Sequence, residues 1–330
     1  MTLMNPYLDP PLRIELPTPF SMGTVNAYLF LEPEPVLVDC GMSTAANKEA
    51  LTAALGEHQL TIQDLKKLII THAHVDHAGA AGWIADNSDT EIWVSNLVYP
   101  WVVDLESMWV SRINFIENIL KLGGLPPERA APYLAYMRQI DQIWEAVPAD
   151  RVVRFPIEGE LTFGGRTWQT LYAPGHTQTQ SCFYHADSKV LISADMLLPI
   201  VPLPVIEQLV GGRDDRVLGL PQYLISMERF ASLDVDTVYP GHGAPFTEHR
   251  AIIDQQRARI AARRSECLRL VQDGVDSVHA LTETMYSHYP AVARMTGFSM
   301  MIGYLDLLLE DRSIKREITS DGRWRFFINT

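Results

Sequence analysis

A nine-residue stretch from Thr71 to Gly79, with the sequence THAHVDHAG, constrains the fold of this 330-residue chain more than any other feature. It follows Leu68 to Ile70, a short apolar run of the kind that forms a buried strand. Alternate side chains of an extended backbone point the same way, which lets His72 and His74 converge on one point. The chain therefore has to fold around a polar cluster at the end of a buried strand.

The same stretch adds a carboxylate and a third imidazole, Asp76 and His77, in the turn before a helix that is predicted from Ala78 to Asp86. Imidazole nitrogen and carboxylate oxygen are the ligands of borderline divalent metals, of which zinc is the commonest. The fixed spacing of these residues argues against a chance cluster in a chain with 10 histidines. One short loop can thus supply two adjacent metal-binding centres.

The pattern His-x-His-x-Asp-His resembles the signature of the metallo-β-lactamase superfamily, in its glyoxalase II-like hydrolase branch. This family carries three further metal ligands at the ends of later strands, and each of them has a match in the sequence. The matching residues, each after a strand-like run, are His176 in APGHT, Asp195 in SAD and His242 in YPGHG.

The resemblance implies an α/β fold, an αββα sandwich in which two mixed sheets pack face to face with helices outside. It also implies two divalent metal ions, for which zinc is expected ahead of iron or manganese. The ligands would be His72, His74 and His176 for one ion, Asp76, His77 and His242 for the other, and Asp195 for both. Asp76 and Asp195 are the predicted catalytic residues, because two ions held in this way can activate a shared hydroxide for attack on a carbonyl.

The residues before the motif alternate between strand and helix patterns. Short strands are predicted at 13–16, 25–31 and 36–38, and a helix is predicted from Ser43 to His58. Asp39 follows the third strand. In the family an aspartate at this point lies beneath the metals, but a turn residue that only ends the strand would explain it equally well.

Residues 97–148 interrupt the expected plan. Apolar residues at helical spacing predict a helix from Leu97 to Leu122, and a second helix begins near Pro127 and reaches about Ala146. This helical hairpin either packs on itself or covers the metal cleft as a lid. The apolar residues that would do so are Trp101, Met108, Trp109, Phe115, Ile119 and Tyr136.

A second irregular stretch, Met196 to Ile206, follows Asp195 directly. Its three prolines exclude a helix interior or a central strand, so we expect an apolar loop that forms a wall of the substrate pocket. Together with the helical hairpin, this loop favours a small-molecule substrate that carries an apolar acyl or aromatic group.

The composition changes after His242, where helical patterns are followed by a β-hairpin with an Asp-Gly turn. This order resembles the winged-helix appendage of some metallo-β-lactamase-fold hydrolases. We therefore predict a catalytic domain over residues 1–245 and a winged-helix-like domain over residues 246–330. The predicted helices of the second domain span 248–272, 277–287 and 297–310, and its strands span 315–318 and 324–328.

A formal net charge of −13 disfavours nucleic acid and other long polyanions as partners. The arginines of the 248–272 helix are therefore assigned to a solvent-exposed face. No apolar run approaches the roughly 18 residues of a membrane span, and the first residues lack a leader pattern. The widely spaced cysteines suggest no disulfide framework, so a cytoplasmic location is expected.

These features favour a dinuclear hydrolase of a thioester, or of another activated ester, because a thiolate leaves without prior protonation. His74 stands where flavodiiron relatives carry Glu, and Leu198 stands where acyl-homoserine lactonases usually carry Tyr. Both departures count against those two chemistries. The alternatives left open are a lactonase, an endoribonuclease on single-stranded RNA, a mononuclear iron persulfide dioxygenase and a non-catalytic nucleic-acid-binding regulator.

Overall fold

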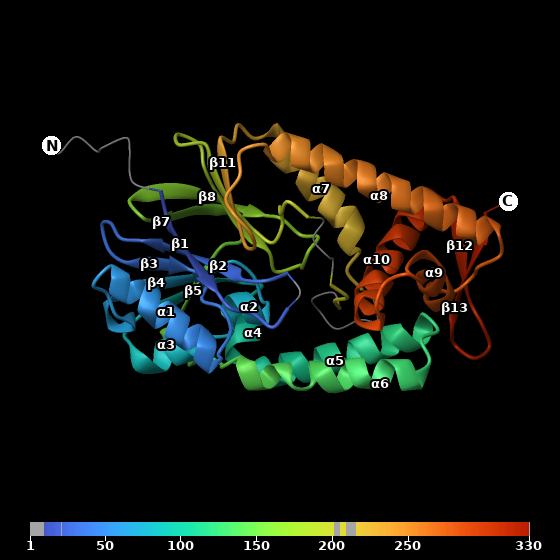
Figure 1. Ribbon diagram of the computed structural model, residues 1–330, viewed down its shortest axis with the longest axis horizontal. Coiled ribbons are helices and arrows are strands. Elements are labelled where there is room, and N and C mark those ends of the chain that lie inside the picture. The colour runs from blue at the N-terminus through green and yellow to red at the C-terminus, as the bar shows by residue number, and fades with distance from the viewer. Residues whose placement is uncertain (1–9, 21, 201–204, 209–215, 330) are drawn as a thin grey trace.

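The computed structural model describes residues 10–20, 22–200, 205–208 and 216–329. Two mixed β-sheets pack face to face with helices on their outer sides (Figure 1), so the predicted αββα sandwich is confirmed. The first sheet has the order β1 (Leu12–Leu16), β2 (Val25–Phe30), β3 (Val36–Val38), β4 (Lys67–Ile70), β5 (Glu91–Ser95) and β6 (Val152–Phe155). The second has the order β11 (Thr237–Pro240), β10 (Val190–Ala194), β9 (Ser181–His185), β8 (Arg166–Tyr172) and β7 (Gly159–Phe163).

The strands β3 to β6 are parallel, so their carboxyl ends lie at one edge of the sheet. The crossovers that parallel pairing requires are made by α1 (Ala45–Glu57) between β3 and β4, and by α2 (Val75–Ala78) and α3 (Ala81–Asn87) between β4 and β5. Thr44 caps α1 by accepting a hydrogen bond from the Asn47 amide. The metal-ligand motif thus sits at an edge where the backbone turns from strand to helix.

Aromatic rings fill the space between the two sheets. Phe30 of the first sheet meets Phe163 of the second edge-to-face at 5.3 Å, and Phe163 stacks on Trp168 at 5.0 Å. These side chains belong to a cluster of buried residues contributed by both sheets. The cluster fixes the two sheets against each other, and with them the strand ends that carry the predicted ligands.

The helical insertion is present, but its helices differ from the prediction. The first predicted helix is divided at Asp104 into α4 (Tyr99–Val103) and α5 (Leu105–Leu122). The second, α6 (Pro127–Met137), ends before the predicted Ala146 and is followed by a 3₁₀ turn. The helix ends early because the backbone of residues 143–147 forms hydrogen bonds with other parts of the protein. The three bonds run from Ser43 N to Ile143 O (2.8 Å), from Glu145 N to Gly79 O (2.9 Å) and from Val147 N to Val102 O (2.7 Å).

Most of the apolar residues named for this insertion pack on one another. Trp101 stacks on Trp144 with ring centres 6.4 Å apart, Trp109 meets both of these rings, and the Trp109 indole N–H donates to Met137 O at 2.9 Å. Tyr136 is different, because its side chain is 47% exposed. The tryptophans therefore hold the hairpin together, and whether the hairpin also acts as a lid stays a prediction.

The sequence analysis predicted no element between residue 206 and the strand before His242, yet the structure has a 14-residue helix there, α7 (Gly219–Ser232). Its third residue is Pro221, which the first turn of a helix tolerates. Of the predicted apolar loop, Met196, Leu197 and Leu198 are fully buried, whereas residues 201–204 lie outside the described residues. Its assignment as a pocket wall stays a prediction.

The C-terminal elements follow the predicted order. The structure has α8 (His249–Gln272), α9 (Val278–Met285) and α10 (Ala291–Glu310), and then a hairpin of β12 (Ile314–Ile318) and β13 (Trp324–Ile328). This part is joined to the rest: Arg216 pairs with the buried Asp306 of α10, and Gln256 of α8 donates to Leu198 O. The winged-helix resemblance and the division into domains 1–245 and 246–330 stay predictions. Within the described ranges, no helix is long and apolar enough to span a membrane.

Candidate metal centre

Strand β4 and the turn after it position the first four predicted ligands. The Asp39 carboxylate anchors this turn by accepting from Thr71 N at 2.9 Å and from Thr71 Oγ1 at 2.8 Å. His74 keeps an extended backbone and is the N-cap of α2, whose single turn carries Asp76 and His77. The extended residues and the helical turn therefore aim their side chains at the same space, as the sequence spacing predicts.

The other three ligands come from loops that end strands of the second sheet. His176 follows β8, Asp195 follows β10 and His242 follows β11. The parallel pairing of β10 with β11 places Asp195 and His242 at the same edge. Gly175, next to His176, has φ +145°, and a Cβ there would lie 2.4 Å from the Tyr223 Cα, so this close approach requires glycine.

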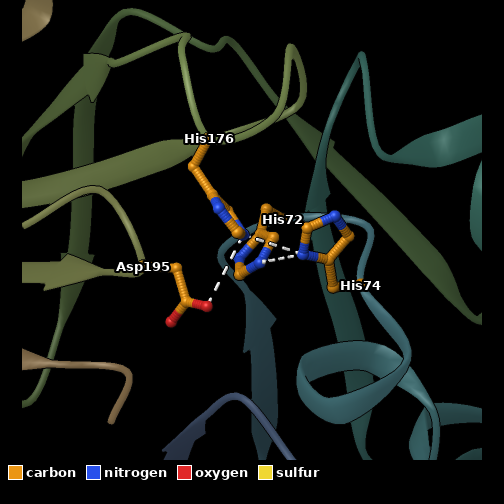
Figure 2. Close-up of side chains that lie close together, drawn as sticks. All are labelled: His72, His74, His176 and Asp195. Carbon is orange, nitrogen blue, oxygen red and sulfur yellow. Dashed lines mark hydrogen bonds and ion pairs between the residues drawn. The ribbon is translucent and has the colours of Figure 1, made fainter. Parts of the chain in front are cut away.

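One group of donors consists of His72, His74, His176 and Asp195, whose ligand atoms all lie within 4.8 Å of one another. Figure 2 shows the three imidazoles turned toward a common centre, with Asp195 beside His176. His74 Nδ1 lies 3.1 Å from His72 Nε2 and 2.9 Å from His176 Nε2, and His176 Nε2 lies 3.5 Å from Asp195 Oδ2.

A second group consists of Asp76, His77 and His242, again with ligand atoms within 4.8 Å. Asp195 lies between the two groups. Its Oδ1 is 3.2 Å from His77 Nε2, and its Oδ2 is 3.4 Å from His242 Nε2. All seven predicted ligands are therefore brought together, in the two sets that the resemblance implies.

The donor atoms are arranged to bind cations, because several of them form no hydrogen bonds with one another. Three buried atoms between the two groups have no hydrogen-bond partner among the described residues: His77 Nε2, His242 Nε2 and Asp195 Oδ1. Buried polar atoms normally have partners, so three that share one region indicate a place for cations. The backbone also leaves room, because a Cβ on Gly241 would lie 2.0 Å from Asp195 Oδ1.

A layer of hydrogen bonds behind the donors fixes their orientation. Asp39 Oδ2 lies 2.8 Å from His77 Nδ1, Thr71 Oγ1 lies 2.9 Å from His72 Nδ1, and the Thr24 carbonyl accepts from His242 Nδ1 at 2.8 Å. Such partners aim the other ring nitrogen at a metal and raise its basicity. This geometry favours the role beneath the metals for Asp39 over that of a simple turn residue.

We expect Asp39→Ala to weaken metal binding by about 10- to 100-fold, because His77 and Thr71 lose the carboxylate that orients them. The measurement is competition for zinc against a chromophoric chelator. Asp39→Asn is the matched variant, since it keeps the size and can still accept from the Thr71 amide, and it should lose less. Equal zinc affinity in the wild type and Asp39→Ala would return Asp39 to the role of a turn residue.

The electrostatics show that this cluster requires positive charge. Burial opposes ionisation of Asp195, yet the imidazoles of His77 and His242 hold its pKa well below the usual range. In return, although burial acts against the imidazolium, Asp195 raises the pKa of His242 to about 10. His72 and His74 respond the other way, because burial and neighbouring cationic groups lower their pKa. The buried Asp195 carboxylate thus requires positive charge beside it.

A sequence model of the metallo-beta-lactamase superfamily matches residues 21–242, which include all seven donors. The chain belongs to the metallo-beta-lactamase superfamily. Within it, this chain is 26% identical to "Probable metallo-hydrolase YqjP" of Bacillus subtilis, over 92% of this chain and 93% of that one. With the His/Asp clusters, this likeness confirms a metal-dependent hydrolase of the superfamily.

A solved metallo-beta-lactamase family protein from Thermus thermophilus has the same fold, with a TM-score of 0.79 and 23% identity. The two structures match over 96% of this chain and 98% of the Thermus chain, so the shared architecture extends beyond the catalytic sheets. More distant relatives are a hydroxyacylglutathione hydrolase of Haemophilus influenzae, 30% identical over 55% of this chain and 70% of its own, and an atrochrysone carboxyl ACP thioesterase of a Cryptosporiopsis species, 23% identical over 59% of each.

The supports of this site were not predicted from the sequence. Asn26 Nδ2 donates to the carbonyls of Pro240 (2.8 Å) and Gly243 (2.7 Å), and Tyr28 Oη donates to Pro240 at 2.6 Å. These bonds hold the loop that carries His242 against β2. No local pattern could reveal them, because the partners are more than 200 residues apart in the sequence.

Proposed function

We propose that the protein is a dinuclear metal-dependent hydrolase that cleaves a thioester, or another activated ester, with an apolar acyl part. The observation that carries this proposal is the position of Asp195 between two separate donor groups. A single-metal site does not need a carboxylate shared by six further ligands. Zinc is the proposed metal, because the set is rich in imidazole nitrogen.

Two divalent cations held by these residues would lower the pKa of a water molecule and polarise the substrate carbonyl. The chain's own residues supply the positions. Asp195 would hold both cations at a fixed separation, and Asp76 would complete the second set opposite His242. His74 is the most exposed of the seven donors, so the substrate would approach from its side.

The proposed thioester follows from the leaving group and from the relatives. A thiolate needs no proton from an acid in order to depart, so a site built from metal ligands suffices. Two relatives carry names that fit this chemistry, one a hydroxyacylglutathione hydrolase and the other an acyl-carrier-protein thioesterase. The glyoxalase II-like branch is therefore part of the proposal, as is an apolar acyl group carried toward the insertion.

The charge pattern supports a small molecule over nucleic acid. Two arginines of α8 have acidic partners within the protein: Arg263 Nη1 lies 2.6 Å from Glu266, and Arg264 pairs with Asp311. Paired cations present little net charge to a phosphate backbone, and the chain as a whole is acidic. The endoribonuclease and the nucleic-acid-binding regulator are thus less favoured.

A substrate panel tests this function. We expect zinc-loaded protein to hydrolyse a medium-chain acyl thioester with kcat/KM at least about ten-fold above that for an acyl-homoserine lactone, an RNA oligonucleotide or glutathione persulfide. Thiol release measures thioester hydrolysis, and oxygen uptake measures the reaction with glutathione persulfide. Metal removal should abolish turnover and zinc should restore it. Persulfide-dependent oxygen uptake with one bound iron, or RNA cleavage without thioesterase activity, would replace this function by the corresponding alternative.

A further inference from the structure

An arginine of the insertion stands out beside the metal centre. Arg112 lies on α5, and its side chain is only 9% exposed. Two neighbouring indoles flank it on one side, with its guanidinium carbon 5.4 Å from the Trp101 ring centre and 5.5 Å from that of Trp109. Cation–π attraction to these rings favours this position of the guanidinium. The side chain is therefore buried against aromatic rings.

Within the described part of the protein, Arg112 has a long ion pair with Glu207 and a buried Nε without a hydrogen-bond partner. The carboxylate oxygen of this pair, Glu207 Oε1, is 3.8 Å from Nη1. Glu207 already serves other groups, because it accepts from Thr177 Oγ1 and from Gln178 N, each at 2.7 Å. A buried guanidinium with an unpaired N–H group is costly, which indicates that a ligand supplies an acceptor.

Arg112 lies close to residues that adjoin the metal centre, where a substrate would bind. Its neighbour Glu207 holds Thr177 and Gln178, the two residues that follow the donor His176. Arg112 is therefore connected through Glu207 to the loop that carries His176, at one side of the donor cluster.

We propose that Arg112 binds an oxyanion of the substrate, a carboxylate or a phosphate, and so selects substrates that carry one. This inference rests on the proposed function. The planar guanidinium presents paired N–H groups that match the two oxygens of either anion. The anion belongs either to the far end of the acyl part, as a carboxylate, or to the thiol part, as a phosphate. The substrate class is thus an anionic thioester.

The test compares paired substrates in the metal-loaded wild type and Arg112→Met. The first pair is an acyl thioester of N-acetylcysteamine with a terminal carboxylate and its methyl ester. The second pair is a neutral acyl thioester of coenzyme A and the same acyl group on N-acetylcysteamine. In one of these pairs the wild type should prefer the charged member, and Arg112→Met should reduce that preference in kcat/KM by about 10- to 100-fold.

Two further variants separate recognition from structure. Arg112→Lys keeps the charge without the planar fork and should retain part of the preference. Arg138→Met is the matched control, because Arg138 caps α6 of the same hairpin, is 57% exposed and lies 3.9 Å from Glu117. A structural role for Arg112 would lower kcat/KM for both members of each pair and leave the ratios unchanged. That outcome, or the absence of a preference in the wild type, would overturn the proposal.

A binding measurement keeps this test independent of turnover. Non-hydrolysable thioether analogues of the same two pairs are titrated into wild type and Arg112→Met by calorimetry. In one pair, the charged analogue should bind the wild type about 10- to 100-fold more tightly than the uncharged analogue does. This difference in affinity should shrink in Arg112→Met. If no thioester is cleaved but this difference is found, the proposed function fails and the anion site stands. If thioesters are cleaved without it, the anion site fails alone.

Discussion

Asp195→Ala is expected to lower kcat by at least about 10³-fold while the protein stays folded, because metal ligands of one site act as a unit. Asp195 lies against both donor groups, with one oxygen 3.2 Å from His77 Nε2 and the other 3.4 Å from His242 Nε2. Its loss removes the shared carboxylate and leaves the first group with imidazoles alone. Turnover of an acyl thioester, circular dichroism and metal analysis are the measurements.

The matched control for this substitution is Asp187→Ala. Asp187 is an exposed residue in the turn between β9 and β10, at the opposite end of β10 from Asp195, so its loss leaves the donor groups intact. This control should retain wild-type metal content and turnover. Near-normal activity and metal content in Asp195→Ala would contradict the shared-carboxylate scheme. An unfolded Asp195→Ala protein would be replaced by Asp195→Asn, which keeps the shape but weakens the negative charge.

His242→Ala is expected to reduce the metal content from about two ions per chain to about one, because the second group keeps only Asp76, His77 and the shared Asp195. His77→Ala should do the same. The His242 change is the sharper one, since His77 Nδ1 also pairs with the buried Asp39 at 2.8 Å and its loss disturbs that carboxylate. The measurement is elemental analysis after dialysis against metal-free buffer, with turnover followed in parallel.

His58→Ala is the control for this experiment, because His58 is an exposed histidine at the end of α1, away from both groups. It should bind as much metal as the wild type. One tightly held iron in the wild type, with no loss on His77→Ala, would contradict the dinuclear centre. Such a result would instead favour the mononuclear iron alternative.

The candidate ligands could be predicted because each one is tied to a local pattern. The cluster from His72 to His77 is a single strand-to-turn segment, and the backbone periodicity of that segment is enough to make its side chains converge. His176, Asp195 and His242 each follow a β-like run, and their pairing with the first four came from a family resemblance. Strands and their ends are set by short-range preferences, which one sequence contains.

The helical insertion shows where such preferences are overridden. The sequence pattern would continue a helix to Ala146, but residues 143–147 leave it because Ser43, Gly79 and Val102 offer backbone partners. The helix α7 was missed for a different reason: a proline within its first turn obscured its start. Partners that are distant in the sequence decide the end of the predicted helix, and no window of sequence contains them.

What the sequence determined by itself is therefore the chemistry: which imidazoles and carboxylates are available and at which strand ends they stand. What only the tertiary structure decided is how those groups are supported and what lies opposite them. Asp39 became a partner of His77 because β3 pairs with β4 in parallel register. Arg112 became a candidate for substrate binding because α5 buries it against two indoles. Burial in a specific place gives a common residue its function, and that place exists only after the chain has folded.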